Sequence, residues 1–154
     1  MTWQSRKAVG ALLNPYMRIG GHKTFAPPLL AHVQTGGFFD IRHGAHVAAI
    51  VLSANRKQWQ DMTWIKAKSL TEADWASILF GVTIAVNKGQ EAIGIEHHNL
   101  SVIHGLIFPK NRLQHEYATY YRNEIQKVTA VTRWTGVRWI PHELNRSNDL
   151  FHLR

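Results

Sequence analysis

The segment from Ser69 to Lys88 constrains the fold more than any other part of the sequence. It opens with Ser-Leu-Thr-Glu, a capping box in which the serine and glutamate side chains satisfy backbone N–H groups at the start of a helix. Apolar residues then recur at helical spacing and continue around the remaining faces. A helix that is apolar on nearly all sides is buried, so we expect residues 69–88 to form the central core helix.

Short apolar segments separated by glycine precede this helix and predict antiparallel strands. The expected strands are 29–34, 38–43, 45–52 and 62–68, with Gly36-Gly37 and Gly44 at the turns.

The pattern after the core helix predicts two more strands, a second long helix and a final strand. The strands are 92–97 and 100–108, joined by a turn at His98-Asn99, and the helix is 111–131, capped by Asn111; the last strand is 137–140. A short helix over 2–13 and a loose tail over 145–154 complete the chain. Residues 1–154 thus read as one two-layer α+β domain, an antiparallel sheet of five to six strands packed against two long helices.

Composition narrows the function classes. The chain has no cysteine, which excludes disulfides, thiolate nucleophiles and finger-type zinc sites. The phosphate-binding GxxxxGK[ST], dinucleotide GxGxxG, GxSxG and HExxH motifs are also missing, which argues against the corresponding chemistries. No apolar run is long enough for a membrane span, so we expect a cytoplasmic protein with no membrane partner.

A formal charge of +8 favours a polyanionic partner. Cations neutralise phosphates, and tryptophan faces can stack on unpaired bases. The first hypothesis is therefore a basic protein that binds DNA or RNA without enzymatic activity and without a cofactor. Its candidate binding residues are Arg112, Arg122, Lys127, Arg133, Arg138, Trp139, Lys66 and Lys68.

Histidines beside a predicted turn support an alternative, a small histidine-dependent phosphodiesterase or nuclease. Its candidate catalytic residues are Glu96, His97 and His98, and only this alternative calls for a divalent metal. With Asn111 and His115 the segment resembles the ββα-metal nucleases in residue types, although its spacing differs from theirs.

The remaining histidines predict no complete site. His104 alternates with apolar residues and is expected on the core face of a strand, as is His97, while His98 is expected to reach solvent. His43 and His46 flank one turn but do not complete a ligand set, so no metal site is assigned. A third alternative is an assembly subunit that binds an acidic protein or a second copy of itself.

Overall fold

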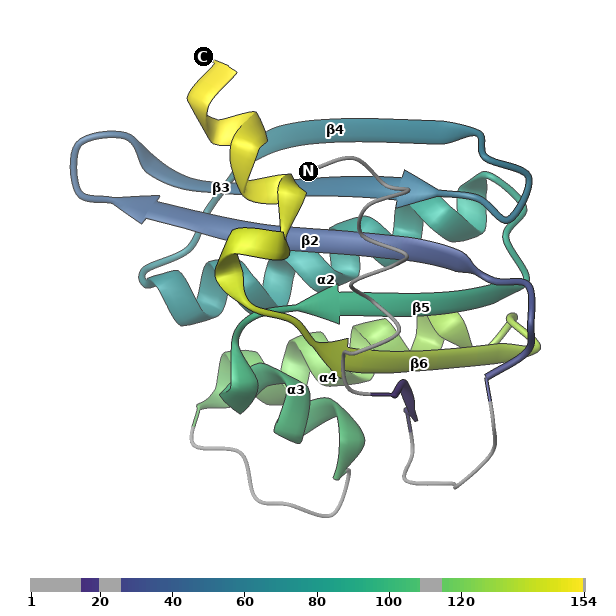
Figure 1. The fold of residues 1–154 in the computed structure, drawn as a ribbon. Helices are drawn as coiled ribbons and strands as arrows, with labels where there is room; N and C mark the ends of the chain where they lie inside the picture. The colour runs from purple at the N-terminus through teal and green to yellow at the C-terminus, as the bar shows by residue number, and fades with distance from the viewer. Residues whose placement is uncertain (1–14, 20–25, 109–114, 154) are drawn as a thin grey trace.

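The computed structural model describes residues 15–19, 26–108 and 115–153 (Figure 1). Its elements are β1 (Met17–Arg18), β2 (Ala31–Asp40), β3 (Gly44–Leu52), β4 (Gln58–Ile65), α2 (Leu70–Asn87), β5 (Ala92–His97), α3 (Leu100–Ile107), α4 (Glu116–Thr129), β6 (Trp134–Trp139), and two 3₁₀ segments, η1 (His142–Leu144) and η2 (Arg146–Leu153). The expected helix over 2–13 lies outside the described residues. Among those described, no helix has the length and apolar character needed to cross a membrane.

The described strands form one six-stranded sheet in the order β1-β6-β5-β2-β3-β4. Strands β2, β3 and β4 make the expected antiparallel meander, but β5 pairs parallel with both β2 and β6. The prediction of an antiparallel sheet was therefore wrong, and the sheet is mixed. Parallel pairing needs a long crossover, and α2 supplies it between β4 and β5, while α3 and α4 supply it between β5 and β6.

Helix α2 confirms the core helix that the sequence predicts. Ser69 is its N-cap, and its hydroxyl accepts the Glu72 N–H at 3.2 Å. The Glu72 carboxylate reaches back to the backbone N–H of Lys68 at 3.1 Å. The helix packs on β2 and β3, and α4 packs beside it on the same face of the sheet (Figure 1). Helix α2 therefore contacts the sheet on one side and α4 on another, which explains why apolar residues occur on most of its faces.

Strand β2 runs without a break through Gly36-Gly37, where the sequence predicted a turn. Both glycines lie at close approaches of other backbone and side-chain atoms: a Cβ at Gly37 would fall on α2, and one at Gly36 would fall on η2. These glycines mark tight packing across the strand, so the expected strands 29–34 and 38–43 are one strand.

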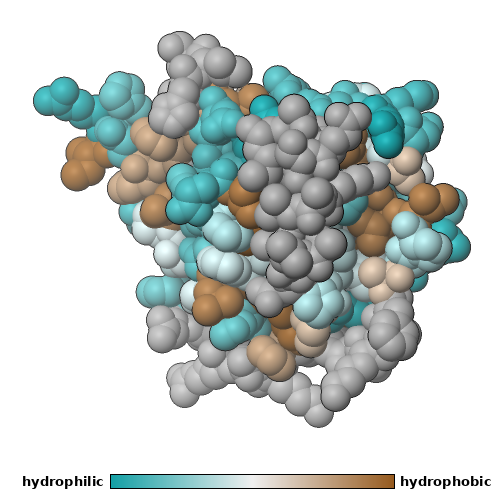
Figure 2. Space-filling view, in the orientation of Figure 1, coloured by the Kyte–Doolittle hydropathy of each residue, from teal (hydrophilic) through white to brown (hydrophobic). Residues whose placement is uncertain are grey.

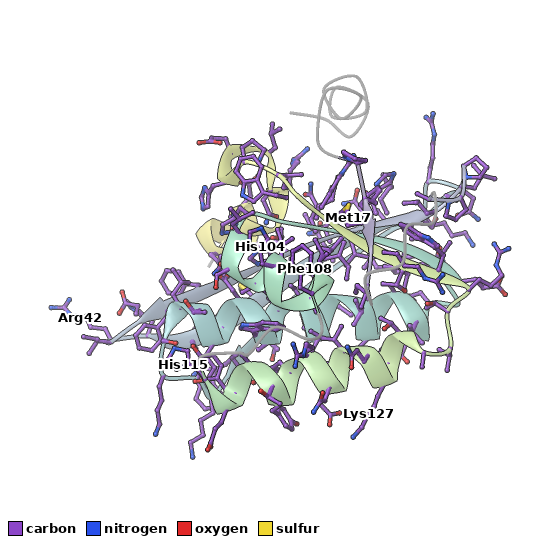
Figure 3. All side chains as sticks on the ribbon, turned by 90° about the horizontal axis from the view of Figure 1, so that it is seen from below. Met17, Arg42, His104, Phe108, His115 and Lys127 are labelled. Carbon is purple, nitrogen blue, oxygen red and sulfur yellow. The ribbon has the colours of Figure 1, made fainter. Side chains whose placement is uncertain are left out.

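Residues 100–107 form helix α3, and the predicted strand over 100–108 was wrong. The Asn99 side chain caps the helix by accepting the Val102 N–H at 3.3 Å. Leu100 is half exposed, and His104 is exposed beside Phe108 instead of facing the core (Figure 3). The alternating apolar pattern also fits a helix that buries Val102, Ile103, Leu106 and Ile107.

Other boundaries differ from the expected ones. Strand β4 occupies 58–65 and β6 occupies 134–139, whereas 62–68 and 137–140 were expected. Helix α4 begins at Glu116 after His115, and the predicted cap Asn111 lies outside the described residues. Residues 145–153 pack against the sheet face opposite α2 rather than forming a loose tail, with Asn145, Ser147 and Leu150 buried.

Candidate active site

The site forms at the carboxyl end of β5, which lies beside the middle of β2 just past the Gln34–Glu96 pair. The chain leaves β2 toward β3 on one side and leaves β5 toward β6 on the other, the arrangement in which open α/β sheets form ligand-binding crevices. Here Asp74 of α2 meets His97 and His98 at the end of β5, and one side-chain oxygen or ring nitrogen of each lies within 4.8 Å of the others. Among the described residues, this is the one such cluster of histidine and acidic side chains.

Asp74 is almost fully buried near the start of α2. Its Oδ1 accepts the Gly37 N–H at 3.0 Å, and its Oδ2 accepts the Asn99 amide at 2.9 Å. Burial alone would raise the pKa of Asp74, but hydrogen bonds from His97, Asn99 and Gly37 outweigh burial and lower that pKa below 3.8. Asp74 is therefore an ionised carboxylate at neutral pH.

His97 is fully buried and orients the cluster. Its Nδ1 accepts the backbone N–H of Asn99 at 2.9 Å, so the ring proton of the neutral form sits on Nε2. Nε2 lies 3.5 Å from both Asp74 Oδ1 and the Ser77 hydroxyl. In this tautomer neither ring nitrogen of His97 has a lone pair free for a metal. The ring is buried, as its predicted core face implies, and this burial speaks against the catalytic role that was also proposed for His97.

His98 is the partly exposed member of the cluster and stacks on His97 with ring centroids 4.6 Å apart. The Asn145 amide donates to the Thr35 carbonyl at 2.8 Å, and the same nitrogen lies 3.0 Å from His98 Nδ1. The other Asn145 atom, Oδ1, accepts from Ser147, which fixes the amide orientation. Nδ1 of His98 is therefore the acceptor, and its Nε2 carries the proton.

Burial, and next the nearby His97, lower the pKa of His98 from 6.5 to about 4. Because the folded-state pKa lies below the unfolded value, the neutral ring stabilises the fold fully above pH 6.5, and this contribution is lost as the pH falls toward 4. We expect the free energy of unfolding to drop over this window, by at most about 1.4 kcal/mol per pH unit from this group. Urea unfolding at pH 7 and pH 5 measures the drop, which His98→Gln should reduce.

The exposed β4 residue Gln60 provides the control, because it has no titratable group and Gln60→Ala should leave the pH dependence unchanged. A His98 ring that titrates near pH 6.5 by NMR would contradict this prediction.

Glu96 lies outside this cluster and serves the fold. It is fully buried on the opposite sheet face, where Oε2 accepts from Arg138 Nε at 2.9 Å and Oε1 accepts the Gln34 amide at 3.1 Å. A second guanidinium nitrogen of Arg138 also contacts Glu96. Glu96 is thus held in an ion pair, and this geometry speaks against its predicted catalytic role.

The neighbouring positions are poor in carboxylates. A Cβ at Gly36 would lie 2.5 Å from Oδ1 of Asn148, so a neutral carboxamide fills the space over this glycine. Asp149 is exposed and faces Arg146 at 3.8 Å. Asp74 is therefore the one carboxylate of the cluster.

Nucleases of the two-metal class hold their ions 3.5–4 Å apart, and Mg²⁺ prefers oxygen ligands. One carboxylate, whose oxygens already accept two hydrogen bonds, does not fit such a pair of ions. A single ion such as Zn²⁺ could contact Asp74, but Nε2 of His98 would bind it only after losing the proton that the Asn145 contact places there.

The structure does not gather the predicted cations of α4 and β6 into one patch. Lys127 and Arg133 are exposed, and each faces a carboxylate, Glu124 at 3.2 Å and Glu91 at 3.4 Å (Figure 3 labels Lys127). Arg122 is half-buried and contacts the backbone of α3.

The other predicted binding residues also lie apart from one another. Arg138 is partly buried and held in its ion pair with Glu96, and the Trp139 indole donates to the His98 carbonyl at 2.9 Å. Lys66 and Lys68 are exposed after β4, on the far side of the sheet from β6. Arg112 lies outside the described residues.

Sequence reasoning missed Asp74, Asn99 and Asn145. One signal was available for Asp74, because a carboxylate within a helix that is apolar on all sides must find buried partners. The sequence pattern indicated a turn at Asn99 and a tail at Asn145. Asn99 contacts Asp74 across 25 positions of the sequence, and Asn145 contacts His98 across 47, so neither contact has a local signal.

Solved structures with the same fold identify the class. RNase H1 from the halophilic archaeon Halobacterium salinarum matches with a TM-score of 0.70 at 14% identity, over 78% of this chain and 92% of that one. The N-terminal RNase H domain of a Mycobacterium tuberculosis protein matches with 0.66 at 16%, over 81% and 95%. LC11-RNase H1 in complex with an RNA/DNA hybrid matches with 0.62 at 11%, over 78% and 92%. This chain has the RNase H-like fold.

Residues 35–151 match the family model described as reverse transcriptase-like, and the chain belongs to that family. Among proteins with curated functions, none matches the sequence significantly. The hypothesis of a non-enzymatic nucleic-acid-binding protein was wrong, because the matched family and the RNase H1 structures indicate an enzyme fold of nucleases. The nuclease alternative is the better supported one.

Proposed function

We propose that this domain hydrolyses phosphodiester bonds in nucleic acid, with the RNA strand of an RNA/DNA hybrid as the first substrate to test. The observation that carries the proposal is the Asp74–His97–His98 cluster at the carboxyl end of β5, beside its parallel neighbour β2. The RNase H-like fold supports the substrate class, since a solved structure with this fold contains an RNA/DNA hybrid.

The hydrogen bonds of the cluster suggest a role for each residue. His98 is neutral at pH 7, and its Nε2–H is available to donate to a phosphate oxygen, where it would stabilise charge that develops during hydrolysis. Asp74 supplies the negative charge of the site, and His97 positions Asp74 from within the core. A divalent ion, where one binds, would polarise the phosphate and activate water.

Cleavage of a hybrid labelled on its RNA strand tests the proposal, with EDTA, Mg²⁺, Mn²⁺ and Zn²⁺ compared in parallel. We expect Asp74→Asn and His98→Ala each to slow cleavage about a hundredfold, the usual scale for loss of a positioned acid, base or charge-stabilising donor. Asn is isosteric with Asp and can still accept the Gly37 N–H, so Asp74→Asn should remain folded.

Lys127→Ala, far from the cluster on α4, is the matched control and should cleave at the wild-type rate. The proposal fails if the wild-type chain cleaves nothing under any ion condition while an RNase H1 cleaves the same hybrid. It also fails if both site variants cleave as fast as the control.

A further inference from the structure

The hairpin between β2 and β3 projects beyond the rest of the sheet, on the side where α2 begins (Figure 1). Its tip carries Ile41, which is 95% exposed, and Arg42, which points away from the body of the protein (Figure 3). Beside it, at the end of β4, lies Trp64 with 61% of its surface exposed. We call Arg42, Trp64, Lys66 and Lys68 the hairpin-tip patch.

Trp64 is held in place although it is exposed. A Cβ at Gly44 would lie 2.8 Å from the Trp64 indole nitrogen, so the ring rests on the bare backbone of this glycine. Gly44 also has a φ of +75°, a conformation that favours glycine. The turn that builds the hairpin therefore also seats the indole, which is the arrangement of a surface for stacking rather than of core packing.

The cations of the patch have no carboxylate partner among the described residues. Two acids border the patch and bind its backbone rather than its cationic side chains: Asp40 accepts the backbone N–H of Arg42 at 2.6 Å, and Glu72 accepts that of Lys68 at 3.1 Å. Figure 2 shows hydrophilic residues next to a hydrophobic one at this projecting end. The patch is thus positive and partly aromatic, which suits a polyanion that carries ring systems.

The patch lies close to the candidate active site. Trp64 pairs with His46, and His46 pairs with Phe38, so two strand spacings of about 4.8 Å each separate Trp64 from β2. Phe38 packs on Phe151, so Trp64, His46 and Phe38 share the sheet face that residues 145–153 cover, whereas Asp74 meets Gly37 on the α2 face. The His98 ring contacts Asn145 of that covering segment, so a nucleic acid that reaches His98 from this face would extend toward the hairpin-tip patch.

We propose that the hairpin-tip patch binds a single-stranded segment that flanks the duplex at the active site. Trp64 stacks on an unpaired base, since the bases of an intact duplex already stack on one another, and the three cations neutralise backbone phosphates. The inference rests on the proposed function for the location of the duplex, and it specifies the substrate as a duplex with an unpaired flank.

Fluorescence anisotropy tests the inference separately from cleavage. Labelled RNA/DNA hybrids, blunt or with a six-nucleotide single-stranded overhang, are titrated in EDTA at two salt concentrations. We expect the overhang to tighten binding about tenfold, the scale of one stacked base, and Trp64→Ala to abolish that gain without changing the affinity for the blunt hybrid. The double variant Lys66→Ala/Lys68→Ala should weaken overhang binding and flatten its salt dependence.

Phe108→Ala is the matched control, because Phe108 is 47% exposed at the end of α3, away from Arg42 of the patch (Figure 3). Equal affinity for blunt and overhang hybrids, or an overhang gain that survives Trp64→Ala, overturns the inference. Because binding is measured without hydrolysis, an overhang gain in a chain that cleaves nothing would support the patch while refuting the nuclease. Cleavage without an overhang gain would support the nuclease and refute the role of the patch.

Discussion

Replacing Arg138 with methionine is expected to lower the free energy of unfolding by about 3–5 kcal/mol. Glu96 is fully buried, and its carboxylate is neutralised by an Arg138 side chain that is only 12% exposed. Methionine keeps much of the packing volume, but it leaves the buried Glu96 carboxylate without a positive partner. The Gln34 amide still donates to this carboxylate, and the Tyr16 hydroxyl lies 3.4 Å from Glu96 Oε2. The guanidinium also lies 4.3 Å from the Tyr16 ring centroid, and that cation–π contact is lost with it.

Chemical denaturation of the wild type and two comparison variants measures this effect. Arg133→Met breaks a pair in which both side chains are 72% exposed, so it should cost less than about 1 kcal/mol. The double variant Glu96→Gln/Arg138→Met removes both charges and should be more stable than Arg138→Met alone. Equal losses for Arg138→Met and Arg133→Met would show that burial of the pair contributes nothing.

The elements that the sequence predicted correctly are those whose signals are local. Three such signals were the Ser69–Glu72 cap, the apolar residues around α2 and the glycine at the β2–β3 turn. Each of them is contained in one short stretch of the sequence. Local chemistry is enough to specify a helix start or a tight turn, and these predictions needed no knowledge of the rest of the chain.

Strand pairing and the identity of α3 depended on distant residues. The path of α2 across the sheet decides whether β5 pairs parallel with β2. The residues of β5 themselves do not indicate the direction of pairing. The segment 100–107 fits both an alternating and a helical pattern over its short length, and the Asn99 cap decides for the helix. The prediction failed there because a cap asparagine was interpreted as a turn residue.

Only part of the candidate site could be predicted, because its residues come from separate elements. His97 and His98 are adjacent in sequence and visible as a pair, whereas Asp74 reaches them from another element. Arg138 was read as a surface cation because its charge suggests solvent, but parallel pairing of β5 with β6 sets Arg138 directly opposite Glu96. Register between distant strands thus converts a predicted binding residue into a structural one.

Replacing Gly37 with alanine should destabilise the domain by about 3 kcal/mol, the upper end of the usual range for overpacking. The new Cβ would lie 2.5 Å from the Ala73 carbonyl carbon and 2.6 Å from the Asp74 backbone nitrogen. Both are backbone atoms of α2, so relief requires the helix to move away from β2. That movement also stretches the bond from the Gly37 N–H to the Asp74 carboxylate, so any cleavage activity should fall together with stability.

Gly36→Ala is the matched control for Gly37→Ala, because it adds the same methyl group to the preceding residue of the same strand. Its Cβ would meet Oδ1 of Asn148 at 2.5 Å and the Ser147 hydroxyl at 3.0 Å, which are side-chain atoms. The Asn148 carboxamide can rotate away, so we expect a loss in unfolding free energy of about 1 kcal/mol, measured by the same denaturation. If the two variants lose equal stability, the approach of the α2 backbone to Gly37 is not what makes this glycine necessary.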